Sequence, residues 1–164
     1  MDTQIILTKH NLWLRGDSNG RRADLRGANL HGANLHGADL READLREANW
    51  DSGTLFYPLQ CPETGSFIGY KKASGYIVTL RITEDAKRSS ATSRKCRCSK
   101  AEVIDITKLS GEPSGLTEVI SSYDKLFVYR IGEVVSVDNF DDNRWNECST
   151  GIHFFITREE AVKY

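Results

Sequence analysis

Hydrophobic positions recur every five residues between residues 23 and 50. The repeated unit is alanine, then aspartate or asparagine, then a hydrophobic residue and two more residues, beginning at Ala23-Asp24-Leu25-Arg26-Gly27. A period of five fits neither the α-helix, which repeats about every 3.6 residues, nor the strand, which repeats every two. Self-similarity at a fixed period is typical of repeat architectures. The pattern therefore predicts a chain that turns a corner in every unit, with alanine and leucine pointing inward.

The predicted inward positions alternate one small and one large side chain. They are Ala23, Ala28, Ala33, Ala38, Ala43 and Ala48, with Leu25, Leu30, Leu35, Leu40, Leu45 and Trp50. Charged residues, histidines and glycines fill the remaining positions, and we expect His31 and His36 to point outward. Aspartate or asparagine precedes each leucine, where a short polar side chain can bond to the backbone of a turn.

This A-(D/N)-L-x-x unit resembles the motif of the pentapeptide-repeat family. The resemblance implies a short right-handed quadrilateral β-helix with about four repeats in a coil, hence little more than one coil here. Solenoids bury their cores by stacking, so a single coil has two open ends to cover. We therefore expect the ends to be covered by the N-terminal segment, by the C-terminal domain or by another subunit of a homo-oligomer. Residues 2–16 are the expected cap, because their hydrophobic spacing approximates a helix ending at Gly16.

From residue 54 the five-residue period vanishes and strand-like runs replace it. Residues 66–72 and 75–82 predict a hairpin, and further strands are expected at 101–106, within 126–137 and at 151–156. Residues 109–125, rich in serine and glycine, are expected to form a loop. Thr157 and Glu160 form a predicted capping box that opens a final helix. We expect a mainly β, α+β fold in two domains, with the helical cap and repeats in residues 1–53 and a small antiparallel α+β domain in residues 54–164.

Overall charge and apolar content narrow the expected environment. The net charge of −1 gives no whole-protein field that would favour nucleic acid or a membrane. No apolar stretch approaches the roughly 18 residues of a membrane helix, and residues 1–7 lack the basic region of a signal peptide. We expect a cytoplasmic protein. Its cysteines include no C-x2-C pair, so we expect reduced thiols, no metal and no cofactor.

Residues 87–100 carry the most suggestive chemistry, with six cationic side chains, five hydroxyls and no acid. Arginine offers planar recognition of phosphate, and lysine adds a point charge. Together with His153, this run predicts a binding site for a phosphate-containing small molecule or nucleotide. The expected ligand-binding residues are Lys87, Arg88, Ser89, Ser90, Arg94, Lys95, Arg97 and His153. The alternative is a solvated run balanced by Asp138, Asp141, Asp142 and Glu147. The run lacks aromatic residues, so we expect no nucleic-acid partner.

No nucleophile elbow, P-loop or dinucleotide-binding fingerprint occurs in the sequence, so we assign no catalytic residue. Residues 85–97 and 148–161 resemble a domain of unknown function that follows short pentapeptide runs in bacteriophage and prophage proteins. The resemblance implies a viral or prophage origin, in the host cytoplasm, and no known activity. His153 lies in an alternating strand, where a hydrogen-bonded, half-buried role competes with a role in ligand contact or catalysis.

These observations favour a non-enzymatic phage protein that sequesters a phosphate-bearing or nucleotide ligand and so counters host defence, with the β-helix as a scaffold. Two alternatives remain open. One is a nucleotide-processing or ADP-ribosyl-type enzyme that uses His153 with an arginine or Glu147. The other is a protein-interaction scaffold that inhibits a host factor.

Overall fold

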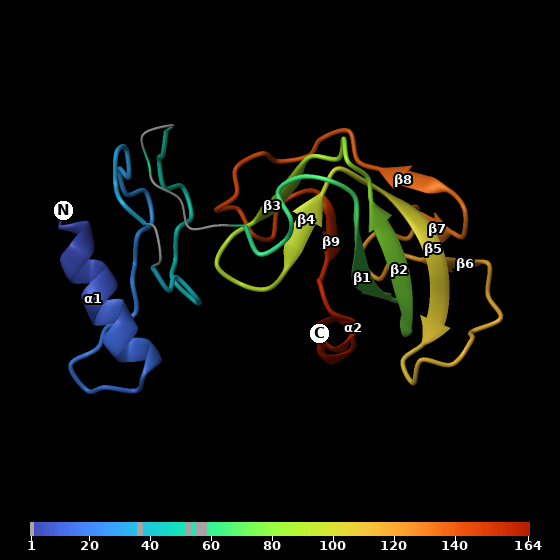
Figure 1. Cartoon of the computed structure of the whole chain (residues 1–164), viewed down its shortest axis with the longest axis horizontal. Coiled ribbons are helices and arrows are strands. Elements are labelled where there is room, and N and C mark those ends of the chain that lie inside the picture. The colour runs from blue at the N-terminus through green and yellow to red at the C-terminus, as the bar shows by residue number, and fades with distance from the viewer. Residues whose placement is uncertain (1, 36–37, 52–53, 55–58) are drawn as a thin grey trace.

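A computed structural model describes residues 2–35, 38–51, 54 and 59–164. A helix lies at one end, the repeat segment follows it, and the strands of the C-terminal domain lie beyond the repeats (Figure 1). The elements are α1 (Thr3–Leu14), β1 (Phe67–Ala73), β2 (Tyr76–Ile82), β3 (Arg88–Ser90), β4 (Cys96–Cys98), β5 (Lys100–Lys108), β6 (Glu118–Ile120), β7 (Val128–Arg130), β8 (Val134–Ser136), β9 (Ile152–Phe154) and α2 (Arg158–Lys163). Neither helix is long and apolar enough to cross a bilayer, a finding that covers the described residues only.

The C-terminal domain consists of antiparallel sheets around a main hydrophobic core, with a smaller cluster of Ile77, Phe155 and Ala161 beside it. Its main sheet has the order β1-β2-β5-β8, a second sheet has the order β3-β4-β9, and β6 pairs with β7. A bridge between Tyr70 and Phe155 links the first two sheets. The predicted hairpin is present, with Ser74 and Gly75 in its turn. The capping box at Thr157 and Glu160 is also confirmed, because each residue bonds to the other's backbone N–H.

The prediction of a loop at residues 109–125 is wrong in part. Residues 118–120 form β6, which pairs with β7, while β8 pairs with β5. Only Val119 of this strand is buried, and three residues are too few for an alternating hydrophobic pattern that would predict a strand. The predicted domain boundary at residues 53 and 54 adjoins residues 52–53, which lie outside the described residues, and it stays a prediction.

The repeat segment stacks on itself at a spacing of twenty residues. Parallel bridges join Asp24 to Asp44 and Asn29 to Asn49, the offset expected if four pentapeptides make one coil. Leucines 25, 30, 35, 40 and 45 are buried together with four of the six predicted alanines, Ala23, Ala28, Ala43 and Ala48. The other two, Ala33 and Ala38, are partly buried and pack against the same cluster. A closed quadrilateral β-helix remains what the resemblance implies, and His36 lies outside the described residues.

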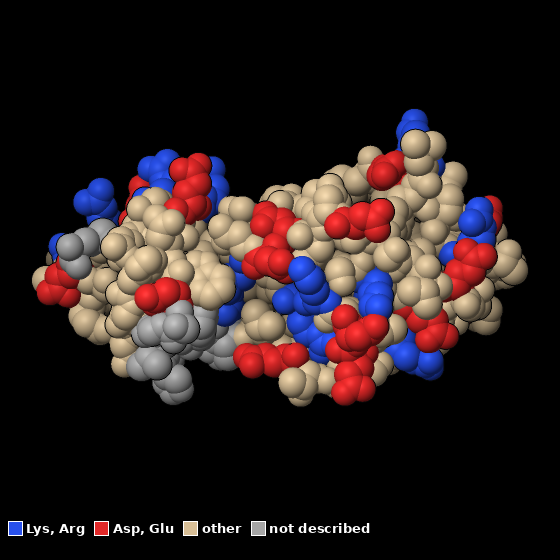
Figure 2. Space-filling view, turned by 90° about the horizontal axis from the view of Figure 1, so that it is seen from above, with Lys and Arg blue, Asp and Glu red and all other residues tan. Residues whose placement is uncertain are grey.

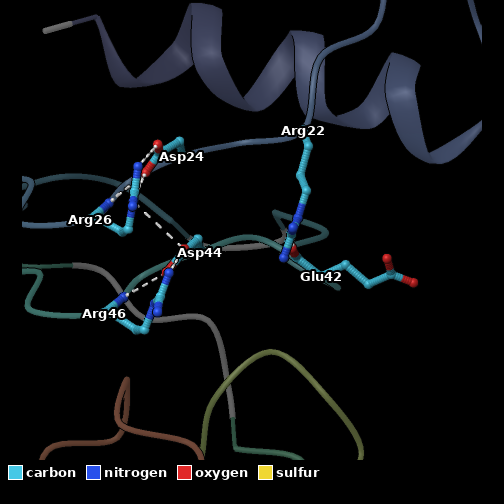
Figure 3. A network of polar contacts seen from close by, with 6 residues as sticks. All are labelled: Arg22, Asp24, Arg26, Glu42, Asp44 and Arg46. Atoms are coloured by element: carbon cyan, nitrogen blue, oxygen red, sulfur yellow. Dashed lines mark hydrogen bonds and ion pairs between the residues drawn. The ribbon is translucent and has the colours of Figure 1, made fainter.

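A ladder of charged side chains runs along one edge of the stacked repeats (Figure 3). Asp24 binds Arg26 and Asp44 binds Arg46, each pair at 2.6 Å, while Arg26 also lies 3.6 Å from Asp44 in the next coil. Arg26 lowers the pKa of Asp24 to about 2. Most of these side chains face solvent, where ion pairs contribute little stability, so the ladder positions the turns more than it strengthens the fold.

Helix α1 covers one end of the coil. Ile6 and Leu7 pack against the buried leucines, and His10 is fully buried beside them. The His10 ring accepts a hydrogen bond from the Ala23 N–H at 3.2 Å and donates one to the Arg41 carbonyl at 3.0 Å. This imidazole therefore links α1 to the first repeat through Ala23 and to the fourth repeat through Arg41.

Close packing also requires Gly20 at the return from the helix. A Cβ atom at this position would lie 2.1 Å from the backbone nitrogen of Trp13, which is far inside contact distance. Only glycine lets the chain pass the helix this closely. The predicted cap at residues 2–16 is thus a helix of twelve residues, held by a packed return segment.

The C-terminal domain covers the other end of the coil. Ala91 and Trp145 belong to the same buried cluster as the leucines, and Trp145 is 2% exposed. The prediction that Trp50 points inward is wrong, because Trp50 is 37% exposed and Trp145 is the tryptophan that packs in this cluster. Since both ends are covered within one chain, open ends no longer give a reason for the predicted homo-oligomer, which stays a prediction.

The last residue of each described repeat takes a left-handed backbone conformation. Gly27, Gly32, Glu42 and Glu47 have φ values of 61°, 66°, 62° and 60°. Glycine adopts this conformation freely, whereas a residue with a Cβ atom is strained there. This distinction between the glycine and glutamate repeats was not predicted from the sequence.

Replacing Glu47 with glycine is therefore expected to stabilise the protein by about 0.5–1 kcal/mol, because relief of strain exceeds the added chain entropy. Glu47 is exposed, so little packing is lost. Chemical denaturation measures the change. The reverse substitution, Gly27→Ala, should destabilise by a similar amount, since no atom lies within 4 Å of the added methyl group. A lower stability for Glu47→Gly would contradict the corner assignment.

Candidate functional site

The cationic run at residues 87–100 lies partly in a small sheet, whose two strands from this run are joined by residues 91–95. It includes β3 and β4, which pair with each other, and β4 also pairs with β9. Because neighbouring residues of a strand point to opposite faces, the predicted binding residues are sent in different directions. Figure 2 shows lysine and arginine side chains interspersed with aspartate and glutamate on the face that it presents.

Two arginines of the run bind the protein's own backbone. Arg97 is 2% exposed, and its guanidinium donates to the carbonyls of Thr150 at 2.7 Å and of Asp141 and Asn143 at 3.0 Å. Burial lowers the pKa of Arg97. Arg88 donates to the carbonyl oxygens of Pro62, Gly65, Thr83, Glu84 and Ala86. Both guanidinium groups therefore organise loops and do not face a common cavity.

Other charges of the run pair with the protein's own carboxylates. Lys87 lies 2.9 Å from Asp142, Arg94 lies 2.6 Å from Glu160, and Lys100 pairs with Asp85. The Ser90 hydroxyl accepts a hydrogen bond from the Gln60 N–H. The buried Ser89 hydroxyl has no partner among the described residues. The structure thus does not gather the run into one site, and the expected convergence of these side chains on a ligand is not what it shows.

Lys95 and His153 do meet, at a cavity of about 500 Å³ that we call the Lys71 cavity. Lys71 of β1, Tyr129 of β7 and the C-terminal Tyr164 also line it. The full lining is Lys71, Lys95, Ser121, Tyr123, Asp124, Phe127, Tyr129, Val137, Asn139, Cys148, Ser149, Thr150, Gly151, Ile152, His153 and Tyr164. Segments that are far apart in the sequence therefore contribute to one cavity, which is open to solvent on one side.

Lys71 is the least expected residue in this cavity. It is 8% exposed, and its Nζ donates to the His153 carbonyl at 3.3 Å and lies 6.0 Å from the centre of the Tyr129 ring. Among the described residues no carboxylate forms an ion pair with it. Burial, and to a smaller extent the positive charge of Lys95, lower the pKa of Lys71 to about 8. The protein thus buries an ammonium group without neutralising it.

Lys95 and His153 complete the polar part of the cavity. Lys95 is 9% exposed, its Nζ lies 3.3 Å from Cys148 Sγ, and it stands 5.7 Å from the centre of the Tyr164 ring. The His153 Nε2 donates to the Ser149 carbonyl at 2.9 Å. Burial lowers the pKa of His153, and the nearby positive charges act in the same direction. The imidazole is therefore neutral at pH 7, and the two lysines supply the charge.

Aromatic rings form much of the remaining wall. Tyr129 is 2% exposed, Phe127 packs against it with ring centres 5.2 Å apart, and Tyr123 and Tyr164 stand at the outside. Burial raises the pKa of Tyr129, so its phenol stays protonated. Flat apolar walls beside two ammonium groups suit an anion that carries a flat ring.

The sequence carried a signal for Lys71 that the analysis missed. In β1 the buried residues are Gly69, Lys71 and Ala73, so the lysine falls on the inward face of an alternating strand. A lysine at such a position is rarely buried without a partner. Tyr129 gave no comparable signal, because its strand has only three residues.

Glu147 and His153, the residues of the enzyme alternative, line different cavities. Glu147 accepts hydrogen bonds from the backbone N–H and the hydroxyl of Ser93, and it lines a second cavity of about 530 Å³ between the coil and the C-terminal domain. His153 lines only the Lys71 cavity of these two. Within the described part of the chain, no group of three or more histidine, cysteine, aspartate or glutamate residues is placed to hold a metal ion. The four cysteines are free thiols, of which only Cys148 is exposed.

Comparison with known proteins adds two matches. Residues 57–161 match the model of a family described as a family of unknown function (DUF5758), and residues 19–49 match the model for pentapeptide repeats, described as eight copies. No curated protein and no solved structure matches the chain. The first match covers more than half of the sequence and all of the strands that line the Lys71 cavity. The chain therefore belongs to this family of unknown function, and its family domain follows a run of pentapeptide repeats.

Proposed function

We propose that the C-terminal domain binds a small anionic ligand with a flat ring in the Lys71 cavity, and that the repeat segment is a non-enzymatic scaffold for it. The observation that carries the proposal is the buried, unneutralised ammonium of Lys71. Burying an unpaired charge destabilises a protein unless something offsets the lost hydration. An anionic ligand would supply the missing countercharge.

The second lysine strengthens this argument. Lys95 is nearly as buried as Lys71 and repels it, since its charge lowers the Lys71 pKa. One phosphate or carboxylate group near both ammonium groups would offset their repulsion and their burial together. The aromatic walls add a surface for a ring. A nucleotide has both features, which is why we keep a phosphate-bearing or nucleotide ligand as the proposed class.

The scaffold role is supported by the way the coil ends are covered. Helix α1 packs on one end, and Trp145 of the C-terminal domain packs on the other. The coil is thus built into a single chain and braces the domain that holds the cavity. If the chain is phage-encoded, as the resemblance implies, sequestering a host nucleotide signal is the use we propose, because binding alone removes such a signal.

Calorimetry tests the binding proposal. Inorganic phosphate, pyrophosphate and a panel of linear and cyclic nucleotides are titrated into the full chain. For the ligands that bind, Lys71→Met and Lys95→Met should each weaken binding by about tenfold or more, the usual effect of losing a charge-assisted contact. Lys87→Ala is the matched control, because Lys87 forms an exposed ion pair away from the cavity.

Two results would count against the proposal. One is that no member of the panel binds, and the other is that Lys87→Ala weakens binding as much as Lys71→Met. Chromatography of ligand recovered after denaturation separates binding from turnover. Intact ligand supports a binding protein, whereas altered ligand supports the enzyme alternative.

A further inference from the structure

We infer that Lys71 forms a reversible imine with its ligand, so that the ligand class is an anion that also carries an aldehyde or ketone group. This inference rests on the proposed function, because the anionic group of the ligand is what brings the carbonyl carbon to Lys71. Nothing in the family description assigns such chemistry.

The surroundings of the Lys71 amine are those of a nucleophile rather than of a structural ion pair. Its Nζ faces a carbonyl oxygen of the His153 backbone and the ring of Tyr129, and it lines the cavity. No carboxylate among the described residues holds it in the protonated state. An amine placed this way can reach a ligand in the cavity.

Four other lysines of the C-terminal domain have different surroundings. Lys72 extends to the Val162 carbonyl at 3.2 Å, and Lys87 and Lys100 pair with aspartates. Lys95 lines the same cavity but lies against Cys148. We therefore assign two roles. Lys95 stays charged and binds the anionic group, while Lys71 reacts.

The acidity of Lys71 supports this division. With a pKa of about 8, roughly a tenth of its side chain is the neutral amine at pH 7, against about one in three thousand for an ordinary lysine. The neutral amine adds to the carbonyl carbon. A carbon–nitrogen double bond then replaces the carbon–oxygen double bond, and the oxygen leaves as water with both amine hydrogens. The step is neither an oxidation nor a reduction, and hydrolysis returns the ligand intact.

Pyridoxal 5′-phosphate is the probe for this inference, because it combines a phosphate, a flat ring and an aldehyde. The full chain is incubated with it at pH 7 and reduced with borohydride, and the modified lysines are identified by peptide mass spectrometry. Lys71 should be labelled about tenfold or more faster than the exposed Lys163, in line with its larger neutral fraction. Labelling spread evenly over the lysines, or absent from Lys71, would overturn the inference.

A second arm separates this inference from the proposed function. Lys71→Arg keeps the positive charge but cannot form an imine, so the variant should still bind inorganic phosphate or pyrophosphate by calorimetry and should lose the label. If phosphate binds and the wild-type Lys71 is not labelled, the imine is wrong and the proposed anion site stands. If pyridoxal without phosphate labels Lys71 equally well and phosphate does not compete, the amine is reactive and the anion site is wrong.

Discussion

Replacing Lys71 with methionine is expected to stabilise the folded protein by about 1–3 kcal/mol at pH 7, although it removes the residue on which binding depends. Lys71 is 8% exposed and its pKa falls from an ordinary 10.5 to about 8, so folding works against its charge. Methionine has a similar length and no charge to bury. It leaves the His153 carbonyl without this donor, which offsets part of the gain.

The pH dependence of this gain follows from the direction of the shift. The folded-state pKa is below the unfolded-state value, so between about pH 8 and 10.5 the unfolded chain holds the proton that the folded protein has lost. The Lys71 contribution to wild-type stability therefore rises with pH in that window. The advantage of Lys71→Met should be largest below pH 8 and should vanish near pH 10.5.

Urea denaturation at pH 7 and at pH 10 measures both effects. Lys72→Met is the matched control, since Lys72 neighbours Lys71 but only extends to the Val162 carbonyl, and its change should stay within about 0.5 kcal/mol. If Lys71→Met instead loses stability at pH 7 as well as binding, Lys71 is a structural residue. That result would remove the basis for the ligand site.

Replacing His10 with alanine is expected to destabilise the protein by about 2–4 kcal/mol. The substitution leaves the buried Ala23 N–H and Arg41 carbonyl without their partner and opens a cavity under α1. Since α1 covers the coil end, we also expect the variant to expose the leucine interior and to bind a hydrophobic dye. Thermal denaturation and dye fluorescence measure the two effects. His31→Ala is the control, because His31 is exposed on the same coil.

Acid should weaken the same contact. Burial lowers the pKa of His10 from an ordinary 6.5, outweighing Asp39 and Glu42, which favour the charged form. The group is neutral when folded, so its contribution is complete above pH 6.5 and is lost as pH falls. The gap in stability between wild type and His10→Ala should therefore narrow below pH 6.5. His153 shifts in the same direction but is present in both proteins, so it cancels in the difference. A difference in stability that stays constant with pH would show that His10 is not a neutral ring that holds α1 to the repeats.

The parts of the fold with a repeating pattern were predictable from the sequence. The period of five located the buried leucines, and alternation located the β1–β2 hairpin, because both patterns depend only on which side chains are apolar. The short strand β6 was not predicted, since three residues hold too little pattern, whereas β7 lies within the strand region expected at residues 126–137. The inward position predicted for Trp50 was wrong, because the tryptophan that packs in this cluster, Trp145, comes from a loop about a hundred residues away along the chain.

The candidate site was predictable only in part, and for a definite physical reason. Sequence analysis grouped cationic residues that are adjacent along the chain, whereas the structure separates them and turns Arg97 inward to hold three carbonyls. Two of the predicted residues, Lys95 and His153, do line the cavity. The residue that gives the cavity its character, Lys71, comes from a different sheet. The sequence shows where cationic residues lie along the chain, but only the folded structure shows which of them are buried without an ion-pair partner.

The stacking interval of the repeats limits how the chain can change in length. Residues one coil apart sit above one another, and each end of the coil is closed by a different part of the same chain. Inserting a whole coil would keep both closures aligned, whereas inserting a single pentapeptide would rotate the C-terminal domain away from its seat. Insertions and deletions in this segment should therefore be tolerated only in multiples of four repeats. The repeat run is then a spacer whose length can change only in fixed steps.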